Sequence, residues 1–342
     1  MYIASKRLFS LLFTLLFLLI PAFAQVLQPR GADGNSAAEQ PPEAGASIAV
    51  DVNLVNLFFT VKDRHGVPVR TLTQNDFEVY EDGKPQTIKY FQADAKQPLT
   101  LGLLVDTSGS TEKILPLIRR LGTQFVAKVL DSKDLAFVMS FNVGVDLLQD
   151  LTSPSSDLRD AVIGAPINGG DWTLPGKEGF PDPRNGGRGT LLYDAIYLAA
   201  TEELKHEVGR KTIVVITDGT DQGSQTSIEA TIEAAQKVDA TVYVLLAYDT
   251  DYGERSEDMR RIARETGGNV IEVAQKPGGL EKAIEQVSEE LRAQYYIGYT
   301  PKRKPDGSFR KLQIRLKVNG ELHVQVRKGY YAPKAELARA SF

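Results

Sequence analysis

The spacing of apolar residues changes twice along this chain and divides it into three parts. In the middle part, the continuous apolar run from Leu101 to Val105 is typical of a strand buried on both faces of a parallel sheet. Apolar residues spaced by three or four positions between Ile114 and Val129 then predict an amphipathic helix. The further strands that we predict are 135–141, 143–148, 212–217, 241–247 and 269–273, and the further helices are 190–205, 227–238, 257–266 and 280–293. This alternation predicts an α/β domain at 98–292 with a doubly wound, mainly parallel sheet.

The flanking parts alternate with a period of two, which indicates strands. An N-terminal β segment at 48–97 contains predicted strands at 50–61, 77–80 and 88–91, with a hairpin turn at Asp82-Gly83. A C-terminal β segment at 293–333 contains predicted strands at 294–299, 311–318 and 322–327, the last two joined by a hairpin at Asn319-Gly320. Neither segment has enough strands for a core of its own. We therefore expect the two segments to pack together as a small β-sandwich into which the α/β domain is inserted.

The first 24 residues have the pattern of a secretory signal peptide. Lys6 and Arg7 precede an apolar run from Leu8 to Ile20, and Ala22 and Ala24 provide a small-residue cleavage site. A retained membrane anchor is the alternative, but the run is shorter than the roughly 20 residues that a spanning helix needs. We expect an exported protein, periplasmic or secreted, with no membrane span after cleavage. Residues 25–47, rich in Pro, Gly, Ala, Glu and Gln, are predicted to be a disordered linker.

Composition excludes several classes of protein. The chain contains no cysteine, so its stability comes from buried cores rather than from disulfides, even in an oxidising compartment. Its formal net charge is −4 before the signal is removed, and the signal carries two of the positive charges. A mildly acidic protein has no electrostatic reason to bind nucleic acid. The sequence does not indicate an oligomeric state.

Three short polar motifs stand where an α/β sheet binds its ligands, at the carboxyl ends of strands and the starts of helices. The first, Asp106-Thr107-Ser108-Gly109-Ser110, follows the run that ends at Val105. The second begins at Gly189-Thr190, and the third is Thr217-Asp218-Gly219. A hard divalent cation prefers oxygen ligands of this kind. We therefore predict a metal site formed by Asp106, Ser108, Ser110, Thr190 and Asp218.

The predicted ligands favour Mg²⁺, with Mn²⁺ or Ca²⁺ as alternatives. Two carboxylates and three hydroxyls suit a small hard ion, and Asp218 is expected to act through water. Two carboxylates also leave the ion less neutralised than a cage of four. An open coordination position would then accept an Asp or Glu carboxylate from a partner protein.

The order Asp-x-Ser-x-Ser, Gly-Thr, Thr-Asp-Gly on an alternating α/β pattern resembles the metal-ion-dependent adhesion site (MIDAS) of von Willebrand factor A (VWA) domains. The resemblance covers about residues 98 to 292 and implies the same metal ligands. The flanking stretches 54–57, 77–83 and 295–299 are similar to those of an exported bacterial family known as VWFA-related, abundant in Acidobacteria. That wider resemblance implies an architecture and a metal site rather than a particular partner.

These observations predict a metal-dependent protein-binding or adhesion module of the cell envelope or the secreted space. A structural or assembly factor of envelope complexes is an alternative that the sequence does not separate from it. A metal-dependent hydrolase is less favoured, because cysteine is absent and His65, His206 and His323 do not fall at the end of a central strand. We therefore expect no enzyme activity.

Four further features have open interpretations. Asp194 either orients Thr190 or is a solvated carboxylate or helix-dipole partner, whereas Asp221 is interpreted as a surface carboxylate, with tuning of the metal site as the alternative. The Gly- and Pro-rich stretch 164–188 is expected to lie beside the metal site, where Trp172 either contacts a partner or is a small local hydrophobic anchor. The tyrosines of the C-terminal segment are expected to pack within the sandwich.

Overall fold

A computed structural model describes most of the chain beyond residue 53. The described residues are 54–93, 97–167, 189–219, 221–247, 256–274, 276–318 and 320–334. Every described residue belongs to one compact unit, which spans residues 50–342. The predicted signal peptide, the predicted linker and most of the stretch 164–188 lie outside the described residues. No helix in the described ranges is long and apolar enough to cross a membrane.

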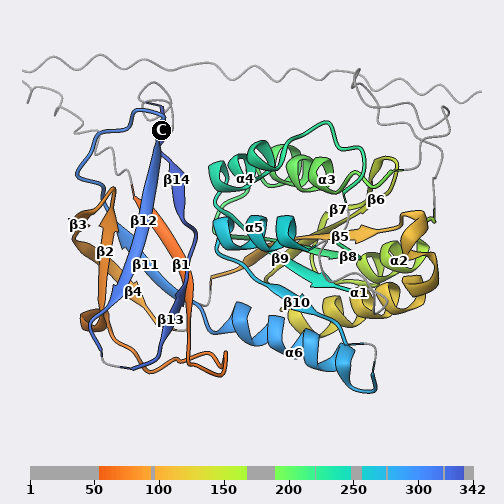
Figure 1. Cartoon of the computed structure of the whole chain (residues 1–342), viewed down its shortest axis with the longest axis horizontal. Helices are drawn as coiled ribbons and strands as arrows, with labels where there is room; N and C mark the ends of the chain where they lie inside the picture. The colour runs from red at the N-terminus through yellow and green to blue at the C-terminus, as the bar shows by residue number, and fades with distance from the viewer. Residues whose placement is uncertain are drawn as a thin grey trace, which may run out of the picture. The chain divides into compact units, whose positions relative to one another are not determined.

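A six-stranded sheet forms the centre of the α/β part (Figure 1). Its strands, in order across the sheet, are β10 (Val270–Glu272), β9 (Ala240–Leu246), β8 (Arg210–Thr217), β5 (Leu99–Asp106), β6 (Leu135–Phe141) and β7 (Val145–Thr152). All neighbouring pairs are parallel except β6 and β7. The chain runs outward from β5 in both directions, which is the doubly wound order. The predicted fold class is therefore confirmed.

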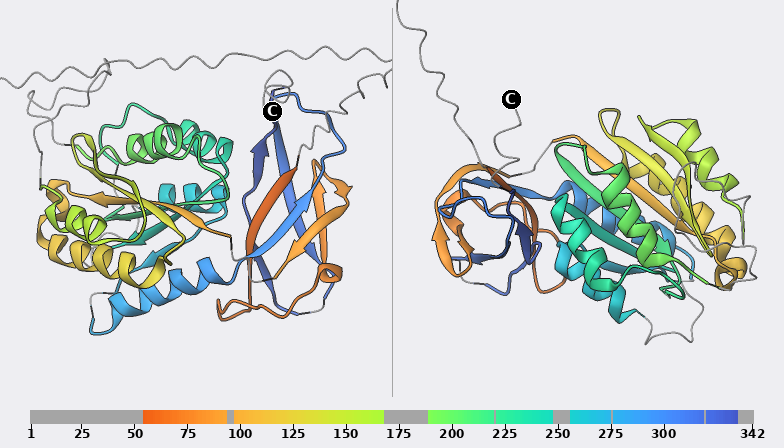
Figure 2. Two further views of the ribbon diagram at one scale, coloured as in Figure 1. Left: turned by 180° about the vertical axis from the view of Figure 1, so that it is seen from behind. Right: turned by 90° about the horizontal axis from the view of Figure 1, so that it is seen from above.

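Helices cover both faces of this sheet (Figure 2). The helices α1 (Leu115–Val129), α2 (Ser156–Gly164) and α6 (Gly279–Arg292) contribute buried apolar residues to the core on one face. The helices α3 (Leu192–Leu198), α4 (Ile228–Lys237) and α5 (Glu257–Thr266) do the same on the other. All eight residues of β5 are buried because a central parallel strand is covered on both sides.

Local sequence explains where several helices begin and end. The Ser227 hydroxyl accepts a hydrogen bond from the Ala230 N–H at 3.2 Å and so caps α4. Helix α5 ends at Gly267, whose φ of 87° is the left-handed conformation that glycine adopts readily.

The predicted helix 190–205 is wrong at both ends. Thr190 lies in a β-bridge before α3, and α3 passes into a π-helical turn at Ala199–Glu203.

The flanking β segments form a β-sandwich, as predicted. One sheet has the order β13-β1-β11-β4 and the other the order β14-β12-β2-β3. The strands are β1 (Val55–Lys62), β2 (Phe77–Glu81), β3 (Lys84–Gln86), β4 (Ile88–Gln92), β11 (Tyr295–Tyr299), β12 (Phe309–Leu316), β13 (His323–Gln325) and β14 (Gly329–Tyr331). The N-terminal β1 pairs with the C-terminal β11, and β2 pairs with β12. Tyr295, Tyr299 and Tyr330 lie in the shared core, which confirms the packing role predicted for them, whereas Tyr296 and Tyr331 are only partly buried and lie outside that core.

The two predicted hairpin turns had different outcomes. Asp82-Gly83 joins β2 to β3, and both residues have positive φ, as a two-residue hairpin requires. The strands on either side of Asn319-Gly320 lie in different sheets, so the hairpin predicted there is wrong. β12 finds its partners in β2 and β14, whereas β13 pairs with the edge of β1. The turn residues were recognised, but the burial of two apolar faces decided which strands paired.

Candidate functional site

Asp106 is the last residue of β5, and its side chain is completely buried. Its Oδ1 accepts a hydrogen bond from the Ser108 N–H at 3.0 Å. Its Oδ2 accepts one from the Thr217 hydroxyl at 2.6 Å. The carboxylate is therefore oriented by its own loop and by the end of the neighbouring strand β8.

The loop after Asp106 brings two serine hydroxyls together. Ser108 Oγ and Ser110 Oγ are 3.1 Å apart. A 3₁₀ helix begins at Gly109, and Ser108 is its extended N-cap residue. The Thr111 hydroxyl donates to the Ser108 carbonyl at 2.8 Å and fixes the turn. Ser108 is buried while Ser110 is exposed, so the pair extends from the end of the sheet towards the surface.

Asp218 directly follows β8 and brings a second carboxylate near the first. Burial raises the pKa of Asp106 to about 7, and the negative charge of Asp218 is the next largest cause of that rise. Hydrogen bonds from Ser108 and Thr217 oppose the rise without cancelling it. Two carboxylates close together in a buried place are unfavourable unless a proton or a cation joins them.

Thr190 is connected to the loop that follows β8 rather than to the start of a helix. Its N–H donates to the Gln222 carbonyl at 2.8 Å, and its own carbonyl accepts from the Gln222 N–H at 2.9 Å. A Cβ on Gly189 would come within 2.6 Å of the Gln222 carbonyl oxygen, so glycine is needed for this close approach. Thr190 is buried and is held in register with the segment that carries Asp218.

The structure thus links all five predicted ligands, though not equally directly. Asp106, Ser108, Ser110 and Asp218 interact with one another through short contacts or charge. Thr190 is joined to the loop of Asp218 through the backbone of Gln222.

Two residues of this region had no predicted role. Thr217 donates to Asp106, and the Asn142 side-chain amide donates to the Thr107 hydroxyl at 3.0 Å. The Asn142 carbonyl also accepts from the Leu191 N–H at 2.8 Å, which ties the Thr190 segment to the end of β6. A signal for Asn142 was present, because it too is a polar residue directly after a buried strand.

Asp194 and Asp221 have structural roles. The Asp194 carboxylate is buried and accepts hydrogen bonds from the N–H groups of Gln225 and Thr226 at 3.0 and 2.9 Å. Neither of the two interpretations considered for it predicted these contacts. Asp221 accepts from the Tyr193 N–H and from the Ser224 hydroxyl, so it joins the loop after β8 to α3.

The oxygen donors present fit a small hard cation. They comprise two carboxylates and neighbouring hydroxyls, without sulfur or imidazole. In the ranges that the structure describes, no group of three or more His, Cys, Asp or Glu side chains is suited to hold a metal ion. Any cation here would therefore depend on the serine and threonine hydroxyls as well as on Asp106 and Asp218. Trp172, predicted to lie beside this site, is outside the described residues.

No model of a known protein family matches the sequence, and no curated protein matches it. Solved structures do resemble the fold. One is the von Willebrand factor type A protein from Catenulispora acidiphila, with a TM-score of 0.46 and 13% identity over 78% of this chain and 76% of that one. Another is the conserved hypothetical protein BatB from Bacteroides thetaiotaomicron, with a TM-score of 0.41 and 20% identity over 56% of this chain and 98% of that one.

A third similar structure is an aerotolerance-related membrane protein from Bacteroides fragilis, with a TM-score of 0.42 and 17% identity over 56% of this chain and 98% of that one. Identities this low concern the fold alone. The doubly wound fold of this protein is established by its own strand order, and its chemistry has to be argued from its own residues.

Proposed function

We propose that this chain is an exported, metal-dependent protein-binding module. In this proposal Asp106, Ser108, Ser110, Thr190 and Asp218 hold a divalent cation, and a partner protein offers an Asp or Glu carboxylate to it. The observation that carries the proposal is the completely buried carboxylate of Asp106, placed close to Asp218 and beside serine hydroxyls. Mg²⁺ fits this donor set best, and Mn²⁺ or Ca²⁺ could replace it.

The position of the site supports binding rather than a purely internal role. Ser110 is exposed, so the group of ligands reaches the protein surface. The sandwich contacts the opposite ends of the strands, for example through the ion pair of Arg327 with Asp239, the residue that precedes β9. Strand β8 contributes Thr217 to the site, and its eight residues span roughly 25 Å between the two ends. The sandwich therefore does not cover the Asp106 end of the sheet.

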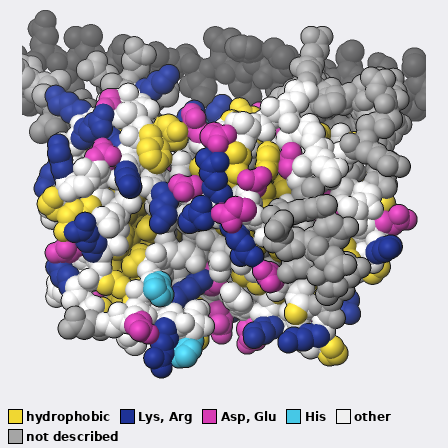
Figure 3. Space-filling view, in the orientation of Figure 1, with side chains coloured by type: hydrophobic (Ala, Val, Ile, Leu, Met, Phe, Trp, Pro, Cys, Tyr) yellow, Lys and Arg dark blue, Asp and Glu magenta, His cyan; other side chains and the backbone are white. Residues whose placement is uncertain are grey.

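Surface charge is consistent with a protein partner. Figure 3 shows basic and acidic side chains interspersed over one face of the molecule. A nucleic-acid surface would instead gather basic side chains into a continuous patch. Export is proposed from the signal-like N-terminus, and sequencing the N-terminus of the mature protein would test it.

Metal binding is tested first, with the metal alone as the probe. Mn²⁺ and Mg²⁺ are titrated by calorimetry into EDTA-treated wild type, Asp106→Ala, Asp218→Ala and the control Asp160→Ala, whose carboxylate is exposed on α2. We expect wild type and control to bind one equivalent and Asp106→Ala to bind none. Binding by Asp106→Ala with unchanged affinity would refute the site.

Partner binding is tested second, by pull-down from envelope extracts with and without EDTA. A protein retained by wild type, but lost with EDTA and with Asp106→Ala, supports the adhesion role. A protein retained after the metal is lost would show that the ion only stiffens the loops. That outcome would favour the structural or assembly role instead.

A further inference from the structure

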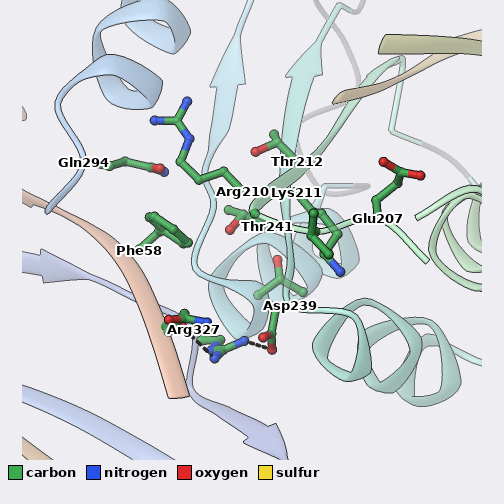
Figure 4. Close-up of a pocket in the computed structure, with 13 residues that line it drawn as sticks. Phe58, Glu207, Arg210, Lys211, Thr212, Asp239, Thr241, Gln294 and Arg327 are labelled. Atoms are coloured by element: carbon green, nitrogen blue, oxygen red, sulfur yellow. Dashed lines mark hydrogen bonds and ion pairs between the residues drawn. The ribbon is translucent and has the colours of Figure 1, made fainter. Parts of the chain in front are cut away.

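A second candidate site lies at the opposite ends of the strands from Asp106. A pocket of about 270 Å³ is lined by β1, by the starts of β8 and β9, and by Arg327 (Figure 4). A pocket of this volume can hold a small organic molecule rather than only a bound water. The lining residues that matter most are Phe58, Arg210, Lys211, Asp239, Thr241 and Arg327.

Arg327 places a buried cation with an unused donor at this pocket. It is only 8% exposed, and its Nη1 forms an ion pair with Asp239. Its Nη2 donates to the Asn56 carbonyl at 3.0 Å. Its Nε is buried and has no hydrogen-bond partner among the described residues. A buried N–H of a charged group is costly to leave unsatisfied, so a ligand acceptor here would stabilise it.

Arg210 and Lys211 add two more positive charges. Burial is the largest cause that lowers the pKa of each of these side chains. Arg210 donates to the Leu291 carbonyl at 3.1 Å, while Lys211 Nζ reaches the Leu204 carbonyl only at 3.5 Å. Such desolvated cations gain stability from an anion brought close to them.

The lining of the pocket contains fewer acidic than basic side chains. Its two carboxylates are Asp239, which is already paired with Arg327, and Glu207. Figure 4 shows Glu207 on the side of the pocket away from Phe58, next to the chain that leads into β8. The lining thus carries three cations and two carboxylates, and the charges of Asp134 and Asp131 also act on Arg210.

Phe58 supplies an apolar wall. Its ring is partly exposed on the outer face of β1 and lies 5.3 Å from the ring of Tyr296, centroid to centroid. Figure 4 shows it facing the starts of β8 and β9, on the opposite side of the pocket from Lys211. A flat apolar group beside an aromatic ring is a favourable neighbour.

We propose that this pocket binds a small organic anion, whose carboxylate or phosphate contacts Lys211 and Arg327 and whose apolar body packs against Phe58. This site is separate from the proposed metal site and does not depend on it. The volume of the pocket favours a small ligand, of about the size of benzoate.

Calorimetric titration with four probes tests the proposal on the full mature chain. Benzoate and phenyl phosphate carry both an anion and a ring, inorganic phosphate carries only the anion, and benzyl alcohol carries only the ring. We expect saturable binding of benzoate or phenyl phosphate, and the tighter of the two identifies the headgroup. Weaker or absent binding of inorganic phosphate and benzyl alcohol is expected, because each lacks one of the two contacts.

Variants locate the binding. Lys211→Gln should weaken the better probe roughly tenfold, because a charge-assisted hydrogen bond is lost. Phe58→Leu should weaken it less, and the control Lys282→Gln, on the exposed side of α6, should not change it. Asp106→Asn should leave it unchanged, so failure of the metal site would not be mistaken for failure here. Lack of saturation by every probe, or equal effects of Lys211→Gln and Lys282→Gln, would overturn the proposal.

Discussion

Two buried carboxylates in this protein have opposite surroundings. Glu81 ends β2 in the sandwich core and is 3% exposed, and Asp106 ends β5 in the α/β sheet and is fully buried. Glu81 accepts hydrogen bonds from the hydroxyls of Tyr299 and Tyr330, each at 2.8 Å, and from Arg310 at 3.1 Å. Asp106 accepts hydrogen bonds from two donors, but its charged neighbour is another carboxylate, Asp218.

The difference is whether the charge of the buried carboxylate is matched within the fold. The charge of Glu81 is matched by the buried guanidinium of Arg310, so that group of residues is complete as it stands. The charge of Asp106 is not matched by a neighbouring cation within the described part of the chain. Burial is common to both carboxylates, so the sign of the nearest charged neighbour is the property that makes Asp106 the candidate for binding a cation.

The largest expected effect comes from removing the charge of Glu81. In Glu81→Gln the buried guanidinium of Arg310 would lose its closest counter-ion and keep only the more distant Asp306, at 3.5 Å. We expect the free energy of unfolding to fall by about 3 kcal/mol, as measured by urea denaturation.

The matched control is Glu78→Gln on the same strand, where the carboxylate is 43% exposed. That change should alter the free energy of unfolding by less than about 1 kcal/mol. Equal losses in the two variants would show that burial of the Glu81–Arg310 pair is not what matters.

The same removal of charge at Asp106 is expected to act in the opposite direction. In EDTA at pH 8, Asp106→Asn should raise the free energy of unfolding by on the order of 1 kcal/mol, because a buried charge beside Asp218 is lost. In Mg²⁺ the wild type should gain stability that the variant does not gain.

The pH dependence of the stability of the metal-free protein tests whether the buried charge of Asp106 causes this difference. The pKa of Asp106 in the folded protein, about 7, lies above the ordinary value of 3.8 for an aspartate. The contribution of the Asp106 side chain to the free energy of unfolding is therefore complete below pH 3.8 and is lost as the pH rises through 7. The stability difference between wild type and Asp106→Asn should grow over this interval, and a constant difference would contradict the explanation.

The smallest expected effect concerns the hydroxyl that orients Asp106. Thr217→Val keeps the shape of the side chain but removes the donor to Asp106 Oδ2. We expect Mn²⁺ affinity to fall about fivefold, corresponding to roughly one hydrogen bond of net stability. Thr212→Val, at a buried position on the same strand, is the control and should leave Mn²⁺ affinity unchanged.

Much of the α/β part could be predicted from sequence because its signals are local. The apolar run before Asp106 and the helical spacing after it identify β5 and α1 within one or two residues. The candidate ligands follow from the same rule, since parallel strands end at one edge of the sheet. Thr217 and Asn142 obey this rule too, but nothing in their residue types distinguishes a positioning group from a ligand.

The sandwich was harder to predict because its partners are distant in sequence. Asp82-Gly83 was recognised as a hairpin, yet the strand Ile88–Gln92 crosses to the other sheet and pairs with β11. The Glu81–Arg310 pair joins residues 229 positions apart. Turn residues limit the backbone locally, but only the packing of two apolar faces decides which strands become neighbours.

The pairing of β1 with β11 also constrains the order in which the parts of the protein can fold during synthesis. The hydrogen bond from Tyr296 to Asn56 spans 240 positions, and β1 has no partner in its sheet until β11 and β13 have been synthesised. The buried face of β1 is apolar and consists of Val55, Leu57, Phe59 and Val61. This face stays uncovered, and the edges of β1 stay unpaired, while the α/β part emerges. Folding of that intervening part brings the two ends together and lowers the entropy lost when the sandwich closes. The α/β part is thus also the scaffold on which the sandwich is completed, and a chain stopped before Tyr295 would leave β1 exposed to association with other chains.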